Sequence, residues 1–124
     1  MEFHNEKPIY LQIADIVFEQ ILLEQLHAGD KIASVREMAV NLRVNPNTVA
    51  RTYAFLEEKH IIQLQRGVGY FVADTAKQSV IAFKKHEFLT TALPQLFKTM
   101  DLLELSLADV KTLYDNRGNA HEKK

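Results

Sequence analysis

Residues 34–56 read SVREMAVNLRVNPNTVARTYAFL and contain the signals for two short helices joined by a tight turn. Ser34 and Glu37 have the spacing of a capping box, in which each side chain bonds the backbone N–H of the other residue. The first helix is therefore expected to begin just after Ser34. Asn45 and Pro46 predict the start of the second helix, because asparagine caps free N–H groups and proline suits the first helical position.

The second of these predicted helices separates apolar from polar side chains at helical spacing. Its inward-facing positions are Val49, Tyr53 and Leu56, and its outward-facing positions are Asn47, Thr48 and Arg51. Two short helices with such a turn are typical of a helix-turn-helix, whose second helix enters the DNA major groove. Asparagine can pair with adenine edges and arginine with guanine edges, so the outward side chains have the chemistry for base recognition. If only the helical pattern is considered, a small helical core without a DNA-binding role explains these residues equally well.

A change of period after His60 predicts a β-hairpin directly behind the helix-turn-helix. Ile62 and Leu64 alternate with glutamines, RGVG at 66–69 forms the turn, and residues 70–72 return. Glycines and a cation at the tip of such a wing let the backbone approach a phosphate or the minor groove. The hairpin therefore favours a DNA-binding domain over a helical core alone.

A helix is expected to begin at Pro8, because apolar residues follow it at helical spacing. Its expected end is Ala-Gly-Asp at residues 28–30, since glycine is the usual residue beyond a helix C-terminus. Leu11, Phe18 and Leu22 form a second apolar stripe on this helix, which either a second layer or a partner should cover.

Helical spacing resumes at Thr75 and carries a broad apolar stripe. Pro94 is expected to kink or locally break this helix, because proline lacks a backbone donor and crowds the preceding turn. A last helix should begin at Ser106 and run to about Asn116, before a flexible tail over residues 118–124. The apolar stripe could line a ligand cavity, but core and dimer packing is favoured because two helices enclose little volume.

The composition excludes several classes of protein. The chain has 124 residues, of which 47% are hydrophobic and 25% charged, with a net charge of −1 and no cysteine. It is too short for separate cofactor and substrate domains, and it lacks disulfides, a thiolate nucleophile and a cysteine zinc site. No apolar run approaches the roughly 20 residues that cross a bilayer, and acids near the N-terminus argue against a secretory signal. These features predict a cytoplasmic protein without a membrane partner.

The near-neutral net charge argues weakly against nucleic acid, but the charges are unevenly distributed along the chain. Residues 31–56 hold four cations and one carboxylate, a local balance of +3. The cations are Lys31, Arg36, Arg43 and Arg51. Segregation of this kind gives a neutral protein a basic face that can neutralise phosphates.

Catalytic, metal and nucleotide sites have little support in the sequence. Gly67-Val68-Gly69 lies between predicted strands rather than before a helix, which argues against a phosphate-binding loop. The five histidines lack the spacing of metal ligands, and no Ser-His-Asp or paired-carboxylate arrangement can be identified. The sequence therefore predicts a protein that is not an enzyme and uses no cofactor.

Four segments together resemble the winged-helix DNA-binding domain of GntR-family bacterial transcription regulators. They are PIYLQI at 8–13, AGDKIASVREMA at 28–39, VNPNTVARTY at 44–53 and RGVGYFV at 66–72. The family usually has proline where Ala28 and Ala33 stand, and glycine where His60 stands. The short helical C-terminal part resembles that of the YtrA-type subfamily, which implies a role mainly in dimerisation.

The resemblance implies a mainly α-helical fold with a small β-hairpin, in which a winged helix-turn-helix domain precedes a two-helix dimerisation domain. The DNA-binding domain is expected over residues 1–74 and the dimerisation domain over residues 75–117. The predicted DNA-binding residues are Ser34, Arg36, Asn45, Asn47, Thr48, Arg51, Arg66 and Gly67. The predicted dimerisation residues are Phe83, Phe88, Leu89, Leu93, Leu96, Phe97, Met100, Val110 and Leu113.

The function expected from these features is that of a sequence-specific transcription regulator, acting as a repressor. A homodimer would place two recognition helices in successive major-groove half-sites, so the partner is expected to be a pseudo-palindromic double-stranded DNA operator. The sequence does not identify a small-molecule effector. The alternative is a winged-helix protein-interaction module, in which the outward face of residues 47–55 binds protein instead of DNA.

Overall fold

The computed structural model describes the backbone of residues 6–122 and the side chains of residues 6–118. The chain divides after Lys84 into two compact units. We call the first unit the head, and the second, residues 85–124, the C-terminal unit. No helix within the described residues is long and apolar enough to cross a membrane.

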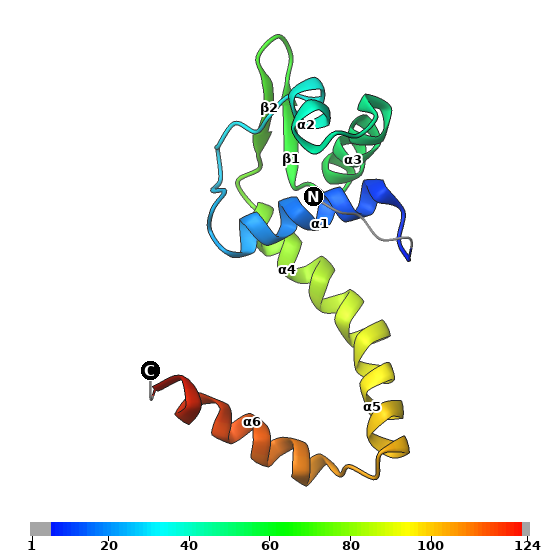
Figure 1. The fold of residues 1–124 in the computed structure, drawn as a ribbon. Helices are drawn as coiled ribbons and strands as arrows, with labels where there is room; N and C mark the ends of the chain where they lie inside the picture. Colours follow the sequence, from blue (N-terminus) through cyan, green and yellow to red (C-terminus); the bar gives the residue numbers. More distant parts are fainter. Residues whose placement is uncertain (1–5, 123–124) are drawn as a thin grey trace. The chain divides into compact units, whose positions relative to one another are not determined.

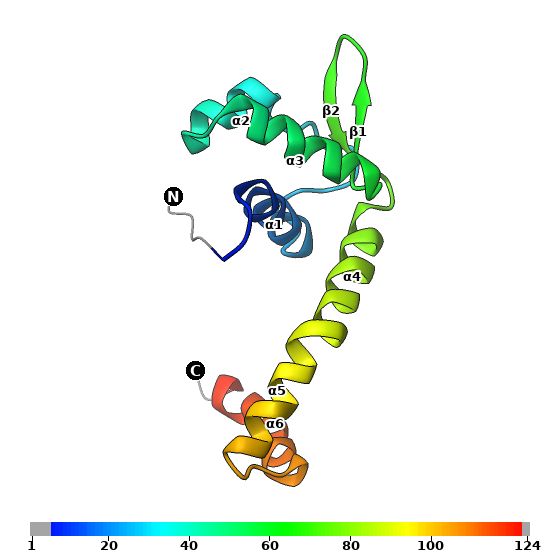
Figure 2. The same cartoon turned by 90° about the vertical axis from the view of Figure 1, so that its right-hand side faces the viewer.

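The head combines a helix-turn-helix with a β-hairpin. Its elements are α1 (Ile9–Leu22), α2 (Val35–Leu42), α3 (Pro46–Glu58), β1 (Ile62–Gln65), β2 (Gly69–Val72) and most of α4 (Ala76–Glu87). Helices α1 and α2 both pack against α3, and the hairpin projects beyond α2 and α3 (Figures 1 and 2). The predicted mainly helical fold with a small β-hairpin is confirmed.

The caps predicted around the helix-turn-helix are present. The Glu37 N–H donates to Ser34 Oγ at 3.1 Å, and the Ser34 N–H donates to the Glu37 carboxylate at 2.9 Å, which completes the capping box. Asn45 Oδ1 accepts from the Asn47 N–H at 2.8 Å, with Pro46 at the first position of α3. Between the helices, Arg43 adopts the left-handed conformation (φ 57°), which reverses the chain sharply enough for α3 to pack against α2.

The predicted hairpin is present, and β2 begins at Gly69, the last residue of the segment that was expected to form the turn. Ile62 pairs with Val72 and Gln65 pairs with Gly69, and Gly67 in the turn takes a positive φ of 76°. The segment before α2 joins the free edge of β2 through an isolated bridge between Lys31 and Phe71. This bridge leaves no signal in the sequence, because a single pair of residues produces no alternating run.

One hydrophobic core fills the head. Its completely buried side chains come from α1, α3, the strand region and α4, and they include Ile13, Val49, Tyr53, Leu56, Ile61 and Val80. Phe18 on the second apolar stripe of α1 is buried and contacts Phe55 and Phe83, with ring centroids 6.4 and 5.5 Å apart. Of the two alternatives for this stripe, a second layer supplied by α4 therefore covers Phe18.

The predicted end of the first helix at residues 28–30 is wrong, because α1 ends at Leu22. Glu24 adopts the left-handed conformation (φ 59°) that was expected of a glycine. The Gln25 N–H donates to the Gln20 carbonyl at 2.8 Å and the Glu24 N–H to the Ile21 carbonyl at 3.1 Å, which closes the helix end. The chain then extends to the hairpin, where the Gly29 N–H donates to the Val72 carbonyl at 2.8 Å.

The division between the two units lies after Lys84, ten residues beyond the boundary expected at 74 and 75. The first part of α4 belongs to the head, because Ala76 and Val80 are buried in its core and Phe83 packs against that core. The expected boundary followed the change from strand to helix period, which does not reveal where a helix packs.

The C-terminal unit contains the end of α4, a π-helical turn η1 (Phe88–Ala92), α5 (Leu93–Leu102) and α6 (Leu107–Glu122). The π-helical turn ends immediately before α5, whose second residue is Pro94. The regular α-helix is therefore interrupted next to the proline, as its missing backbone donor predicts. Ser106 and Asp109 form a capping box at the start of α6, where a helix start was predicted.

The predicted helix end near Asn116 is also wrong. Helix α6 continues through Gly118 to Glu122. A glycine in a helix interior costs only about 1 kcal/mol relative to alanine and does not by itself end a helix. Of the expected flexible tail over residues 118–124, residues 123–124 lie outside the described part of the chain.

Replacing Tyr53 by phenylalanine should lower the free energy of unfolding by about 0.5–1.5 kcal/mol. Tyr53 is completely buried, and its hydroxyl donates to the Ala33 carbonyl at 2.6 Å, which links α3 to the loop before α2. The substitution keeps the ring and removes only this hydrogen bond. Urea unfolding at pH 7 measures the difference, and an unchanged midpoint would contradict the predicted contribution.

The same residue should make stability depend on alkaline pH. Burial raises the pKa of Tyr53 from 10.0 to about 12. The unfolded chain therefore loses this proton first, so stability that is fully present below pH 10 is lost as the pH rises through 12. The Tyr53→Phe protein should show a shallower alkaline decline than wild type, and parallel declines would show that Tyr53 does not titrate in this way.

Candidate nucleic-acid interface

A cleft of about 370 Å³ lies between the start of α1 and the start of α3. The residues that line it are Pro8, Ile9 and Tyr10 from the α1 side and Asn47, Thr48 and Arg51 from α3. Three of the predicted DNA-binding side chains therefore share one cleft, at the end of the helix that a helix-turn-helix directs toward base edges.

Buried residues on the opposite side of α3 fix the direction of these side chains. Val49 and Tyr53 are completely buried, so the helical period turns Asn47 and Arg51 to the surface, where both are exposed. Thr48 is half-buried at the edge of the cleft. The predicted inward and outward faces of this helix are confirmed.

The guanidinium of Arg51 lies over the ring of Tyr10. Arg51 Cζ is 4.0 Å from the centroid of that ring, a distance typical of a cation–π contact. A guanidinium that stacks on an aromatic ring uses its face, while hydrogen bonding uses the N–H groups at its edge. Arg51 can therefore stack on Tyr10 and still donate to an acceptor in the cleft.

Among the described residues, the cations of the helix-turn-helix and wing form no ion pairs with acids. Within the part of the chain that the structure describes, no carboxylate forms an ion pair with Lys31, Arg36, Arg43, Arg51 or Arg66. The one carboxylate in this segment, Glu37, bonds the backbone and side chain of Ser34, and these bonds lower the pKa of Glu37. These cations are therefore available to phosphates.

The two cap residues among the predicted DNA-binding residues already have structural roles. Ser34 Oγ and Asn45 Oδ1 both accept backbone hydrogen bonds at helix starts. The Ser34 hydroxyl hydrogen and the Asn45 amide hydrogens remain potential donors. Arg36 is exposed on the first turn of α2, outside the cleft that Arg51 lines.

At the wing, Arg66 and Gly67 are exposed in the turn. Lys31 lies against the same hairpin, because a Cβ on Gly69 would meet Lys31 Cε at 2.9 Å. Gly69 also takes a φ of 144°, so both conformation and space favour glycine there. Lys31 is thereby held beside the wing as an additional cation.

Lys31 and Tyr10 are the candidate site residues that sequence reasoning did not assign. Lys31 appeared in the local charge balance and within a motif, and Tyr10 only in a motif. Their positions depend on contacts with residues 38 and 41 positions away, Gly69 and Arg51. These two contacts could have been predicted only from the way the elements of the head pack against one another.

A second cleft of about 480 Å³ lies beside β1, and its polar lining includes Glu57, His60, Gln63 and Thr75. Its residues do not form a metal site, because no group of three or more His, Cys, Asp or Glu among the described residues is placed to hold a metal ion. None of the predicted DNA-binding residues lies in this cleft.

Comparison with known families agrees with the geometry of the head. The family model of bacterial regulatory proteins of the gntR family matches residues 9–72, which run from the start of α1 to the end of β2. The chain belongs to the GntR family. The resemblance stated from the motifs is thereby confirmed, and the family is one of regulators rather than enzymes.

Individual relatives support the same assignment. The chain is 49% identical over 76 residues to the HTH-type transcriptional regulator YhcF of Bacillus subtilis, covering 61% of this chain and 63% of YhcF. It is 40% identical over 80 residues to the HTH-type transcriptional repressor YtrA of Bacillus subtilis, covering 64% of this chain and 62% of YtrA. The chain thus matches less than two thirds of the length of either relative.

A solved structure extends the similarity into the C-terminal helices. A regulator from Bacteroides thetaiotaomicron that is assigned to the GntR family is 36% identical, with a TM-score of 0.78. The similarity covers 91% of this chain and 98% of that chain, so it reaches beyond the head.

The structure shows why glycine would suit a position at which this chain departs from the usual GntR pattern. His60, where the family usually has glycine, adopts the left-handed conformation with a φ of 62°. Its N–H donates to the Glu57 carbonyl at 3.0 Å in the turn that ends α3. Glycine is preferred at such a position because it has no Cβ to clash with the backbone.

Proposed function

We propose that this protein is a sequence-specific DNA-binding transcription repressor that binds a pseudo-palindromic double-stranded DNA operator as a homodimer. The observation that carries the proposal is the exposed start of α3, where Asn47, Thr48 and Arg51 line one cleft. These residue types match the donor and acceptor pattern of bases in the major groove. The name of YtrA as a repressor, at 40% identity, supports repression.

The remaining predicted residues suit contacts to the DNA backbone. Arg36 at the start of α2 and Arg66 in the wing turn are exposed and have no described carboxylate partner. Gly67, with no side chain, lets the turn come close to a phosphate. Ser34 and Asn45 would donate to phosphate oxygens from the two helix starts. Such contacts set the orientation of α3, while base contacts supply specificity.

The C-terminal unit supports the proposed homodimer, because it has too little core of its own. Among its described side chains only Met100 is buried. A unit of about 40 residues usually needs oligomerisation or another cross-link for stability. A second copy would cover the predicted dimerisation residues that are exposed or half-buried, namely Phe88, Leu89, Leu93, Leu96, Phe97, Val110 and Leu113.

Two other residues predicted to mediate dimerisation are not needed for this interface. Phe83 packs in the head, with its ring centroid 5.5 Å from that of Phe18 and 5.9 Å from that of Phe55. Met100 is 8% exposed, and its carbonyl accepts from the Leu105 N–H at 2.9 Å in the turn after α5. We therefore leave both residues out of the proposed interface.

The alternative of a protein-interaction module has less support from the surface. No large apolar side chain of residues 47–55 is among the exposed ones, since Val49 and Tyr53 are buried and Phe55 is half-buried. Protein-binding surfaces are usually anchored by exposed aromatic or large apolar groups. The polar, cationic face of α3 fits nucleic acid better.

Selection of bound sites from random duplex DNA should yield an inverted repeat. Its half-site centres are expected about 10–10.5 base pairs apart, or a multiple of this, because two symmetric heads must reach successive major grooves. Affinity for the selected site should fall steeply with salt, as counterions are released from neutralised phosphates. Fluorescence anisotropy with the labelled site measures both properties.

One control and two contrary outcomes separate the alternatives. A scrambled duplex of the same composition should bind much more weakly than the selected site. Recovery of no common sequence, together with salt-independent binding, would contradict DNA recognition and favour the protein-interaction module. Recovery of single or direct-repeat sites would contradict the symmetric dimer alone.

A further inference from the structure

Tyr10 connects the first helix of the head to the start of the recognition helix through its side chain. One face of its ring carries the Arg51 guanidinium, whose Cζ lies 4.0 Å from the ring centroid. The Tyr10 ring also meets Phe55 edge to face, with centroids 6.3 Å apart and planes at 81°. The Tyr10 ring is thus supported by the aromatic cluster of the head and cannot follow Arg51 freely.

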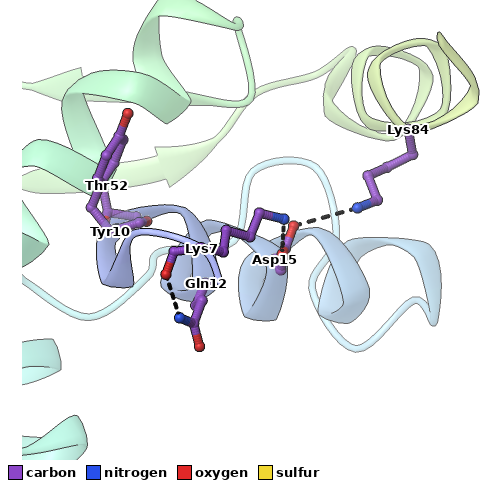
Figure 3. A network of polar contacts seen from close by, with 6 residues as sticks. All are labelled: Lys7, Tyr10, Gln12, Asp15, Thr52 and Lys84. Carbon is purple, nitrogen blue, oxygen red and sulfur yellow. Dashed lines mark hydrogen bonds and ion pairs between the residues drawn. The ribbon is translucent and has the colours of Figure 1, made fainter. Parts of the chain in front are cut away.

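The backbone of Tyr10 is anchored to the same helix. The hydroxyl of Thr52, which is completely buried, lies 2.8 Å from the Tyr10 carbonyl oxygen and 3.1 Å from that of Thr48. Figure 3 shows Thr52 and Tyr10 next to each other where α3 crosses α1. A hydrogen bond from Thr52 to Tyr10 therefore fixes the start of α1 relative to the residue directly after Arg51.

A second polar network holds the following turns of α1. Asp15 accepts from Lys7 Nζ at 2.5 Å and from Lys84 Nζ at 3.4 Å, and the Gln12 amide donates to the Lys7 carbonyl at 2.6 Å (Figure 3). These contacts tie the segment before α1 and the helix α4 to α1. Tyr10 therefore lies on a helix, α1, that is fixed by α3 through Thr52 and by α4 through Lys84.

We propose that Tyr10 is a positioning residue for Arg51, holding its guanidinium over the cleft in the orientation that reads DNA. This inference rests on the proposed role of Arg51 in base recognition. A free arginine side chain has many rotamers, so one that is already ordered loses less conformational entropy when it binds. Because stacking uses the face of the guanidinium, its edge remains free for a bidentate contact with guanine.

A double-mutant cycle tests the proposal in the full chain. Tyr10→Leu should weaken binding to the selected operator about two- to fivefold, the range expected for one exposed cation–π contact. In the Arg51→Ala background the same substitution should change affinity by less than that, because Tyr10 acts through Arg51. Tyr10→Phe keeps the ring and should bind as wild type.

A readout without DNA separates positioning from general stability. In the free protein, the Arg51 side-chain protons should show an upfield ring-current shift in NMR spectra of wild type and Tyr10→Phe, and should lose it in Tyr10→Leu. If Tyr10→Leu does not fold, Thr52→Val provides the test, because it removes the hydroxyl that anchors Tyr10 while nearly keeping the shape. Thr52→Ser is its matched control and should bind as wild type, whereas Thr52→Val should bind more weakly.

Several outcomes would overturn the proposal. Equal losses from Tyr10→Leu in both backgrounds would show that Tyr10 contacts DNA independently of Arg51. A loss in Tyr10→Phe equal to that in Tyr10→Leu would assign the effect to the hydroxyl. Suppose that wild type shows the ring-current shift while Arg51→Ala binds the operator as tightly as wild type. In that case Arg51 is stacked on Tyr10 but does not recognise DNA. That result differs from an additive cycle, which refutes only the positioning role.

Discussion

Replacing Arg51 by alanine is expected to lower affinity for the operator about 5- to 150-fold per half-site, corresponding to about 1–3 kcal/mol. Arg51 is exposed, lines the cleft at the start of α3, and has no described carboxylate partner. In the protein without DNA, the guanidinium of Arg51 contacts the ring of Tyr10. The free energy of unfolding should therefore change by no more than about 0.5 kcal/mol, as is usual for surface substitutions.

Two matched variants make the Arg51 result specific. Arg51→Lys keeps the charge but loses the bidentate fork, so it should retain the salt dependence while losing discrimination at one base pair. Lys77→Ala removes a cation from α4, where Lys77 Nζ pairs with the Glu24 carboxylate at 3.1 Å, and should leave affinity unchanged. Anisotropy titrations on the operator and on single-base variants measure these differences. Wild-type affinity in Arg51→Ala would refute the assignment of α3 as the helix that reads bases.

Replacing Phe97 by aspartate in the full chain is expected to dissociate the dimer and lower apparent operator affinity about 10²- to 10⁴-fold. Phe97 is 51% exposed on α5, so the charge would be tolerated in a monomer. In the proposed dimer the same charge would be buried without a partner, which is strongly unfavourable. The large effect on affinity follows because two linked heads bind far more tightly than one.

The control for Phe97 is an apolar residue on the head that is also more than half exposed. Leu23 is 59% exposed just after α1, and Leu23→Asp should leave the dimer intact. Sedimentation velocity at micromolar concentration measures both variants. A stable dimer in Phe97→Asp would place the interface elsewhere.

The division after Lys84 also determines which fragment should be used to measure DNA binding by a single head. A fragment that ends at Lys84 keeps Ala76 and Val80 in the core, whereas one that ends at Asp74 removes both. Loss of these buried side chains would destabilise the head. A drop in operator affinity could then come either from misfolding or from the loss of avidity. The fragment ending at Lys84 is therefore the better comparison with Phe97→Asp.

Local chemistry in the sequence determined the helix-turn-helix and the wing. The capping box at Ser34 and Glu37, the Asn45–Pro46 helix start and the alternation around RGVG all act within a few residues. Such signals depend on hydrogen bonds and backbone conformations that are set by near neighbours. For the same reason the outward face of α3, with Asn47, Thr48 and Arg51, was predicted correctly.

Tertiary packing decided what local signals could not. Glu24 and His60 take left-handed conformations that sequence patterns expect of glycine, because the chain must turn there to reach its partner elements. The first turns of α4 joined the head because Val80 fits its core, although the helix period is the same on both sides of Lys84. The contact of Arg51 with Tyr10 joins residues 41 positions apart, and only the packing of α1 on α3 brings them together.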